Sequence, residues 1–151
     1  MTSPRDGGCQ CGNIRYRLHG APQMLYVCHC TDCQKQSASA FGMSLIVTPQ
    51  QVEFLRGEAA LSSWDTRGGN GDIKRCHFCP DCGTRIMHGS DDPEDSVSIK
   101  AGSLDDKSDL QPTAHIWLAS AQPWVSVDRA RYACFETEPD DRALLKGDRL
   151  E

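Results

Sequence analysis

The alternation of apolar and polar positions predicts a chain of short strands. Residues 14–18 and residues 97–101 alternate between apolar and polar side chains, which is typical of half-buried strands. Short apolar stretches bounded by Gly, Pro, Asn or Asp indicate further strands between turns. These are expected at residues 24–27, 41–48, 52–57, 61–64, 73–78, 84–88, 115–118 and 125–127.

Helical periodicity is almost absent from the chain. A short helix is expected to carry residues 33–39, with Thr31 or Asp32 as its N-cap. Residues 65–72 form the most Gly-rich stretch and are expected to be a flexible loop, and residues 142–146 are read as a short helix or as disordered chain. With no repeat and no linker, the pattern predicts one mainly β domain over residues 1–151, with a core at about 8–139 and a charged tail at about 136–151.

Composition then narrows the chemistry. The chain has 151 residues, nine of them cysteines, and a net charge of -5. An N-terminus without an apolar region and the lack of a long apolar run suggest no signal peptide and no membrane span, so we expect a cytoplasmic protein with reduced thiols. Clustered cysteines in that setting favour metal over disulfides, and the negative charge argues against nucleic-acid or membrane partners.

Two cysteine pairs predict a structural zinc site. Cys79 and Cys82 flank Pro80-Asp81 and precede a glycine, as in a zinc knuckle between two strands. Two ligands cannot complete a tetrahedron, and Cys9 and Cys11, in their own glycine-flanked turn, are the best candidates for the second pair. The alternative is a redox dithiol, which would need a βαβ pattern that the strand-like flanks lack.

A second cysteine cluster lies at Cys28, Cys30 and Cys33. Three thiolates with an open fourth position are typical of zinc that performs chemistry. The alternative is a second closed site, completed by Cys76 or, less favourably, by His77. The intervening His29 is expected to point away from the metal, beside the ligands or into solvent, and Cys134 is expected to be a small buried hydrophobe.

The cysteine motifs and their flanks resemble those of the glutathione-dependent formaldehyde-activating enzyme family, which also includes centromere protein V. The matching segments are residues 8–12 (GCQCG), 28–33 (CHCTDC), 78–84 (FCPDCGT), 101–106 (AGSLDD) and 112–124. The similarity extends from about residue 8 to residue 139. Cys76 stands outside the family pattern.

The resemblance implies an Mss-four-like fold of stacked small antiparallel sheets with zinc knuckles, and two zinc ions per chain. It implies a structural zinc on Cys9, Cys11, Cys79 and Cys82, and a catalytic zinc on Cys28, Cys30 and Cys33. The implied activity is that of a carbon–sulfur lyase, in which glutathione condenses with formaldehyde to S-(hydroxymethyl)glutathione.

The mechanism expected from the residues is attack of a zinc-held substrate thiolate on a small aldehyde. Lys35 and Arg75 are candidates to meet the carboxylates of glutathione. Two other functions stay open: a non-catalytic zinc module that binds a protein partner, and a thiol redox protein. The expected partner is a small thiol such as glutathione, and homo-oligomer formation is left open.

Overall fold

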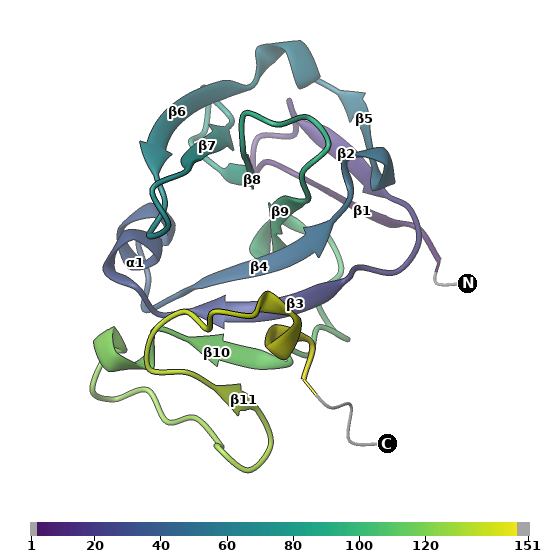
Figure 1. The fold of residues 1–151 in the computed structure, drawn as a ribbon. Coiled ribbons are helices and arrows are strands. Elements are labelled where there is room, and N and C mark those ends of the chain that lie inside the picture. The colour runs from purple at the N-terminus through teal and green to yellow at the C-terminus, as the bar shows by residue number, and fades with distance from the viewer. Residues whose placement is uncertain (1–2, 148–151) are drawn as a thin grey trace. The chain divides into compact units, whose positions relative to one another are not determined.

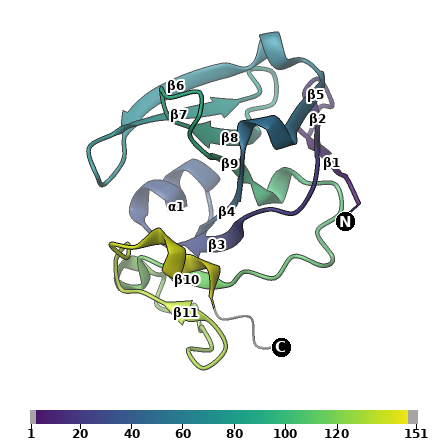
Figure 2. The ribbon, with the colours of Figure 1, turned by 45° about the vertical axis from the view of Figure 1, so that its right-hand side comes forward.

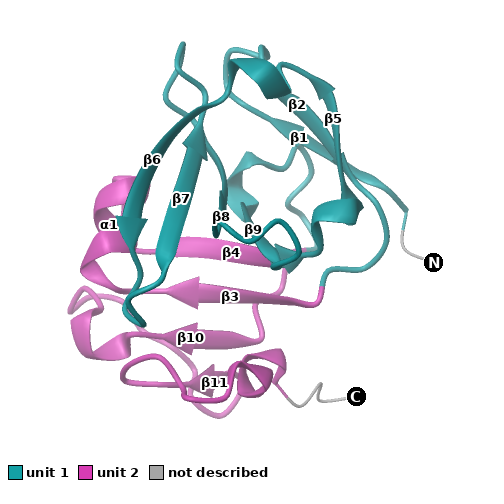
Figure 3. Cartoon of the chain, turned by 45° about the horizontal axis from the view of Figure 1, so that its top comes forward, with its two compact units in different colours: residues 1–22, 46–109 teal, residues 23–45, 110–151 magenta. Residues whose placement is uncertain are grey.

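Eleven strands, one α-helix and five short 3-10 helices make up residues 3–147, the part of the chain that this computed structural model describes (Figure 1). The mainly β prediction is therefore confirmed. The chain divides into two compact units (Figure 3): unit 1 comprises residues 1–22 and 46–109, and unit 2 comprises residues 23–45 and 110–151. The interpretation of the whole chain as one domain stays a prediction.

Unit 1 contains a three-stranded antiparallel sheet and a run of four antiparallel strands. The first has the order β1 (Arg5–Gly8), β2 (Arg15–Leu18) and β5 (Val52–Arg56). The strands of the second follow chain order: β6 (Ser62–Arg67), β7 (Ile73–Phe78), β8 (Arg85–Gly89) and β9 (Val97–Lys100). Figures 1 and 2 show β6 and β7 side by side, joined by residues 68–72. Three 3-10 helices complete the unit: η1 (Pro49–Gln51), η2 (Glu58–Ala60) and η3 (Ala101–Ser103).

The core of unit 1 follows from strand alternation. Tyr16 and Leu18 on β2 point inward, and both are buried. Tyr16 lies opposite Gly7 of β1, and a Cβ on Gly7 would stand 2.5 Å from the Tyr16 ring. The glycine therefore leaves space for this ring, whose hydroxyl hydrogen-bonds the Ser103 hydroxyl at 2.8 Å.

The strands of unit 2 lie side by side in the order β11 (Ala133–Cys134), β10 (Ala114–Ile116), β3 (Met24–Cys28) and β4 (Gly42–Val47). The last two residues of β4 belong to unit 1. β10 pairs in parallel with both β3 and β11. The helix α1 (Thr31–Ser37) connects β3 to β4, and η4 (Leu118–Ser120) follows β10.

The C-terminal 3-10 helix of the described chain, η5 (Arg142–Lys146), is anchored to unit 2. Leu145 is fully buried, and its carbonyl accepts a 2.6 Å hydrogen bond from the Thr113 hydroxyl. Arg142 donates to the Tyr26 hydroxyl at 3.1 Å. Of the two interpretations of residues 142–146, the short helix is therefore the one observed, and residues 148–151 of the predicted tail lie outside the described part.

Three local predictions are wrong in detail. Residues 125–127 form no strand, because the Val125 N–H bonds back to the Gln122 carbonyl at 3.0 Å and closes a turn that contains a proline. The strand expected at 115–118 ends at Ile116, since Trp117 has a φ of 59°. β6 extends to Arg67 within the expected loop, and β1 was not predicted.

Candidate metal centres

The first centre lies in unit 1, where two distant segments of chain meet. Cys9 and Cys11 follow β1, and Cys79 and Cys82 occupy the connection between β7 and β8. The four Sγ atoms all lie within 4.8 Å of one another. The Sγ atom of Cys11 is 3.5 Å from that of Cys9 and 3.8 Å from that of Cys79. The sequence-predicted set of four is therefore brought together, and it could hold a metal ion.

Each of the two segments closes a turn at a glycine. The N–H of Gly12 bonds to the Cys9 carbonyl at 3.1 Å, and the N–H of Gly83 bonds to the Cys79 carbonyl at 2.8 Å. Both glycines have positive φ, 83° and 78°, a conformation that is strained for other residues. In each segment the turn curls the backbone around the sulfurs, and the Ile14 N–H donates to Cys9 Sγ at 3.2 Å.

The electrostatics of the four thiols favour a bound cation. The Thr84 hydroxyl, 3.2 Å from Cys82 Sγ, lowers the pKa of Cys82 to about 5. Although the Asn13 backbone N–H favours the thiolate of Cys11, desolvation and the neighbouring sulfurs raise the pKa of this thiol to about 12. Sulfurs this close repel one another as thiolates. An all-sulfur donor set fits a soft cation such as zinc, which would stabilise all four thiolates together.

The second centre lies in unit 2 and comes from one short segment. Cys28 ends β3, Cys30 precedes α1, and Cys33 lies in the first turn of α1. Their three Sγ atoms also lie within 4.8 Å of one another. The N-cap of α1 is Cys30, whose Sγ accepts the Cys33 N–H at 3.3 Å. The expectation of Thr31 or Asp32 as N-cap is therefore wrong, because the thiol takes the capping position one residue earlier.

The closeness of these three sulfurs also changes the pKa of one of them. The thiols of Cys30 and Cys33, followed by burial, raise the pKa of Cys28. A neutral thiol is a poor metal ligand, so a bound cation would have to displace the Cys28 proton. Three thiolates gathered by a helix start again form a donor set suited to zinc.

A hydrogen-bond network fixes the backbone of this segment. The His29 carbonyl accepts from the Gln34 side-chain amide at 2.7 Å and from the Ser120 hydroxyl at 3.0 Å. The Gln34 side-chain amide also donates to the Ser120 backbone carbonyl at 2.9 Å. The side-chain oxygen Oε1 of Gln34 accepts a hydrogen bond from the Gln122 side-chain amide at 2.8 Å. The network joins α1 to the chain that follows β10. No short-range pattern points to Ser120 or Gln122, because both lie more than 85 positions away from the segment that they hold.

The side chain of His29 is buried, so the part of the expectation that placed it in solvent is wrong. Its Nε2 lies 3.0 Å from Nδ1 of His115, and the two rings stack with centroids 5.3 Å apart. Burial lowers the pKa of His29, and burial together with His29 lowers that of His115 to about 4. Both rings are therefore neutral near pH 7.

Two cysteines belong to neither group among the described residues. Cys76 is fully buried on β7, with its Sγ 3.9 Å from the Lys74 carbonyl. The unit 1 group is thus complete without it. Cys134, on β11, is only half-buried, whereas the sequence suggested a buried position. All nine cysteines lie within residues 3–147, and none of them forms a disulfide there.

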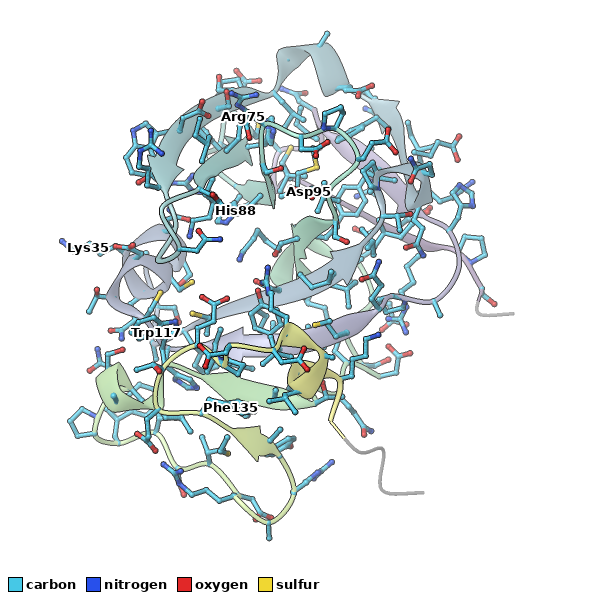
Figure 4. All side chains as sticks on the ribbon, in the orientation of Figure 1. Lys35, Arg75, His88, Asp95, Trp117 and Phe135 are labelled. Atoms are coloured by element: carbon cyan, nitrogen blue, oxygen red, sulfur yellow. The ribbon has the colours of Figure 1, made fainter. Side chains whose placement is uncertain are left out.

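The two basic residues considered for substrate binding differ in their surroundings. Arg75 makes two hydrogen bonds to Asp65, at 2.9 and 2.8 Å, and its positive charge is therefore already compensated. Lys35 is exposed and projects from α1 away from β3 and β4 (Figure 4). Neither of these side chains is held in a preformed binding geometry.

Comparisons with known proteins agree with this arrangement. A family model described as glutathione-dependent formaldehyde-activating enzyme matches residues 4–120, a span that contains all seven grouped cysteines. No curated protein matches the chain. The crystal structure of a Rhodobacter sphaeroides protein is similar with a TM-score of 0.51 and 14% identity, covering 86% of this chain and 98% of that chain, which shows a shared fold.

The described residues contain no helix long and apolar enough to cross a membrane. The family match covers well over half of the chain and includes both cysteine groups. On this evidence, the chain belongs to the glutathione-dependent formaldehyde-activating enzyme (GFA) family.

Proposed function

We propose that the protein is a zinc-dependent carbon–sulfur lyase, which condenses glutathione with formaldehyde or a similar small aldehyde. The observation that carries the proposal is the group of Cys28, Cys30 and Cys33, three thiols gathered within 4.8 Å in a member of the GFA family. In the reaction the thiol sulfur bonds to the aldehyde carbon, and the thiol proton ends on the oxygen.

Two zinc ions per chain are part of the proposal. One would be structural, on Cys9, Cys11, Cys79 and Cys82, and one would be catalytic, on Cys28, Cys30 and Cys33. The catalytic zinc, when bound, would supply a soft Lewis-acid position at which a substrate thiol is kept as its thiolate. The proposal includes an Mss-four-like fold, a single domain and a cytoplasmic location, where the nine thiols would stay reduced.

The residues of unit 2 would position this chemistry. The Cys33 N–H, which donates to Cys30 Sγ, stabilises the thiolate that a metal requires. Gln34 and Ser120 hold the His29 carbonyl, and so fix the backbone between two of the ligands. This support limits the reorganisation needed when substrate binds.

Catalysis is tested by measuring adduct formation above the uncatalysed rate. Exchange spectroscopy on glutathione and formaldehyde gives the rate of S-(hydroxymethyl)glutathione formation with and without the zinc-loaded protein. We expect faster exchange with the protein, and loss of the excess rate in Cys30→Ser but not in Cys134→Ser. Equal rates with and without the protein would remove the substrate assignment and favour a non-catalytic zinc module.

The open fourth position needs its own test, because Cys76 was a candidate to close the site. We expect Cys76→Ser to retain two zinc ions per chain and to keep the excess rate. A fall to one zinc ion, with the fold preserved, would make Cys76 a ligand and would contradict the open site.

A further inference from the structure

One face of the antiparallel strands β6–β9 of unit 1 carries a continuous row of side chains. Here Trp64 of β6 pairs with Cys76 of β7, Cys76 pairs with His88 of β8, and His88 pairs with Ser98 of β9. Residues directly opposite each other on neighbouring strands share a face of the sheet. His88 is only 6% exposed, and Figure 4 shows it on β8. The row therefore brings an imidazole and a hydroxyl together inside the unit.

A register shift adds an arginine to this face. His77 pairs with Met87, but the next residue of β7, Phe78, pairs with Arg85. One residue of β8 is thus passed over, and such a bulge redirects side chains relative to simple alternation. The Arg85 guanidinium lies over the Phe78 ring, 5.2 Å from its centroid. Phe78 stands two positions from Cys76, so Arg85 shares the face of the Trp64–Cys76–His88–Ser98 row.

Three buried polar atoms on this face lack hydrogen-bond partners. They are Nη1 of Arg85, Nε2 of His88 and Oγ of Ser98. Buried polar groups are nearly always satisfied in folded proteins, so each exception calls for an explanation. Arg85 has no carboxylate partner among residues 3–147, although the same sheet pairs Arg75 with Asp65. Three unmet groups on one face indicate a shared ligand rather than three unrelated defects.

The positive charges around these three groups favour a negatively charged ligand. The positive charges of Lys100, Lys74 and Arg85 all act on the His88 ring. Burial first, and these charges second, lower the pKa of His88 to about 2, so the ring is neutral and carries a single N–H. A neutral imidazole, a hydroxyl and a guanidinium can all donate hydrogen bonds to one anion.

We propose that this face of unit 1 binds the carboxylate of a small organic acid, with Arg85, His88 and Ser98 as its donors. The planar guanidinium matches a carboxylate, and His88 would donate through Nε2 in the tautomer protonated there. The site lies wholly within unit 1. It is independent of the reaction proposed for the three-cysteine group, and it holds whether or not that reaction occurs.

Binding is tested on the zinc-loaded full chain by NMR titration of backbone and side-chain N–H signals. Acetate, succinate and S-methylglutathione supply carboxylates on molecules of increasing size, and succinamide is the uncharged counterpart of succinate. We expect at least one carboxylate to shift signals of β7, β8 and β9 saturably, and succinamide to leave them unchanged.

Two arginines make a matched pair of variants. Arg85→Gln should weaken binding at least tenfold, whereas Arg75→Gln, on the same sheet but paired with Asp65, should leave binding unchanged. Arg85→Lys keeps the charge without the planar fork and should bind between these limits, which provides a readout if Arg85→Gln does not fold. Ser98→Ala should weaken binding less than Arg85→Gln.

The proposal is overturned by any of three results. One is that no carboxylate of the panel shifts the β7–β9 signals, which would mean that water alone satisfies the three donors. The second is that succinamide binds as well as succinate. The third is equal binding by the Arg85→Gln and Arg75→Gln proteins.

Discussion

The two cysteine groups gather their thiols in opposite ways. In unit 1, Cys11 and Cys79 are 68 positions apart, and their contact closes a long loop of chain. In unit 2, three thiols come from six consecutive residues, and hydrogen bonds from Gln34 and Ser120 hold the segment. A ligand set that closes a long loop contributes to folding itself, whereas a local set contributes little to it. The comparison predicts that the four-cysteine group of unit 1 serves mainly the stability of the fold. The three-cysteine group of unit 2 is predicted to serve mainly the chemical reaction.

The largest effect should come from Cys79→Ser. Removing one ligand opens the long loop and leaves three crowded thiols, so we expect loss of one zinc ion and a fall of more than about 5 kcal/mol in the free energy of unfolding. Urea unfolding and metal analysis measure both. Cys134→Ser, outside both groups, should change stability by less than about 1 kcal/mol. A stable Cys79→Ser protein with two zinc ions would break the comparison.

The opposite pattern is expected for Cys30→Ser. The unfolding free energy should fall by no more than about 2 kcal/mol, because the residue closes no long loop and serine still caps α1. The excess rate of adduct formation should fall by at least about a hundredfold, since a ligand to the proposed catalytic metal is lost. If Cys30→Ser unfolds as readily as Cys79→Ser, the two groups have the same role.

Gln34→Ala sharpens the comparison inside unit 2. It removes the amide that donates to the carbonyls of His29 and Ser120, and it leaves Gln122 without an acceptor. We expect a cost of about 1–3 kcal/mol in unfolding free energy and weaker zinc binding at the three-cysteine group. Lys35→Ala, on the exposed side of α1, should cost less than about 0.5 kcal/mol. Similar costs for both variants would argue against the network.

A smaller effect is expected from pH, and it tests unit 1. His88 has a folded-state pKa of about 2, below the unfolded value near 6.5, so the unfolded state binds more protons beneath that value. The contribution of neutral His88 to the free energy of unfolding is therefore complete above pH 6.5. It is lost as the pH falls below this value, by at most about 1.4 kcal/mol per pH unit. His88→Leu should flatten this slope between pH 6.5 and 5.5 in urea unfolding. Equal slopes in both proteins would show that other groups dominate.

The sequence by itself was enough for much of the fold. The alternation at residues 14–18 and 97–101 reappears in β2 and β9, because strand alternation is a local property. The glycines after Cys11 and Cys82 marked the two turns, since only the local backbone decides them. The secondary-structure predictions were wrong where tertiary contacts outweighed the local sequence pattern. Residues 125–127, expected to be a strand, instead follow a turn closed between Gln122 and Val125, and the neighbouring Trp124 is 73% exposed.

The members of both cysteine groups were also predictable from the sequence, because metal-ligand spacing is encoded in short motifs. Tertiary structure alone decided which distant groups support them. The network of Gln34, Ser120 and Gln122, the stacked histidines and the bulge at Arg85 join positions with no mark in the sequence. The physical reason is that a hydrogen bond between distant residues depends on register and packing, which short-range patterns do not contain.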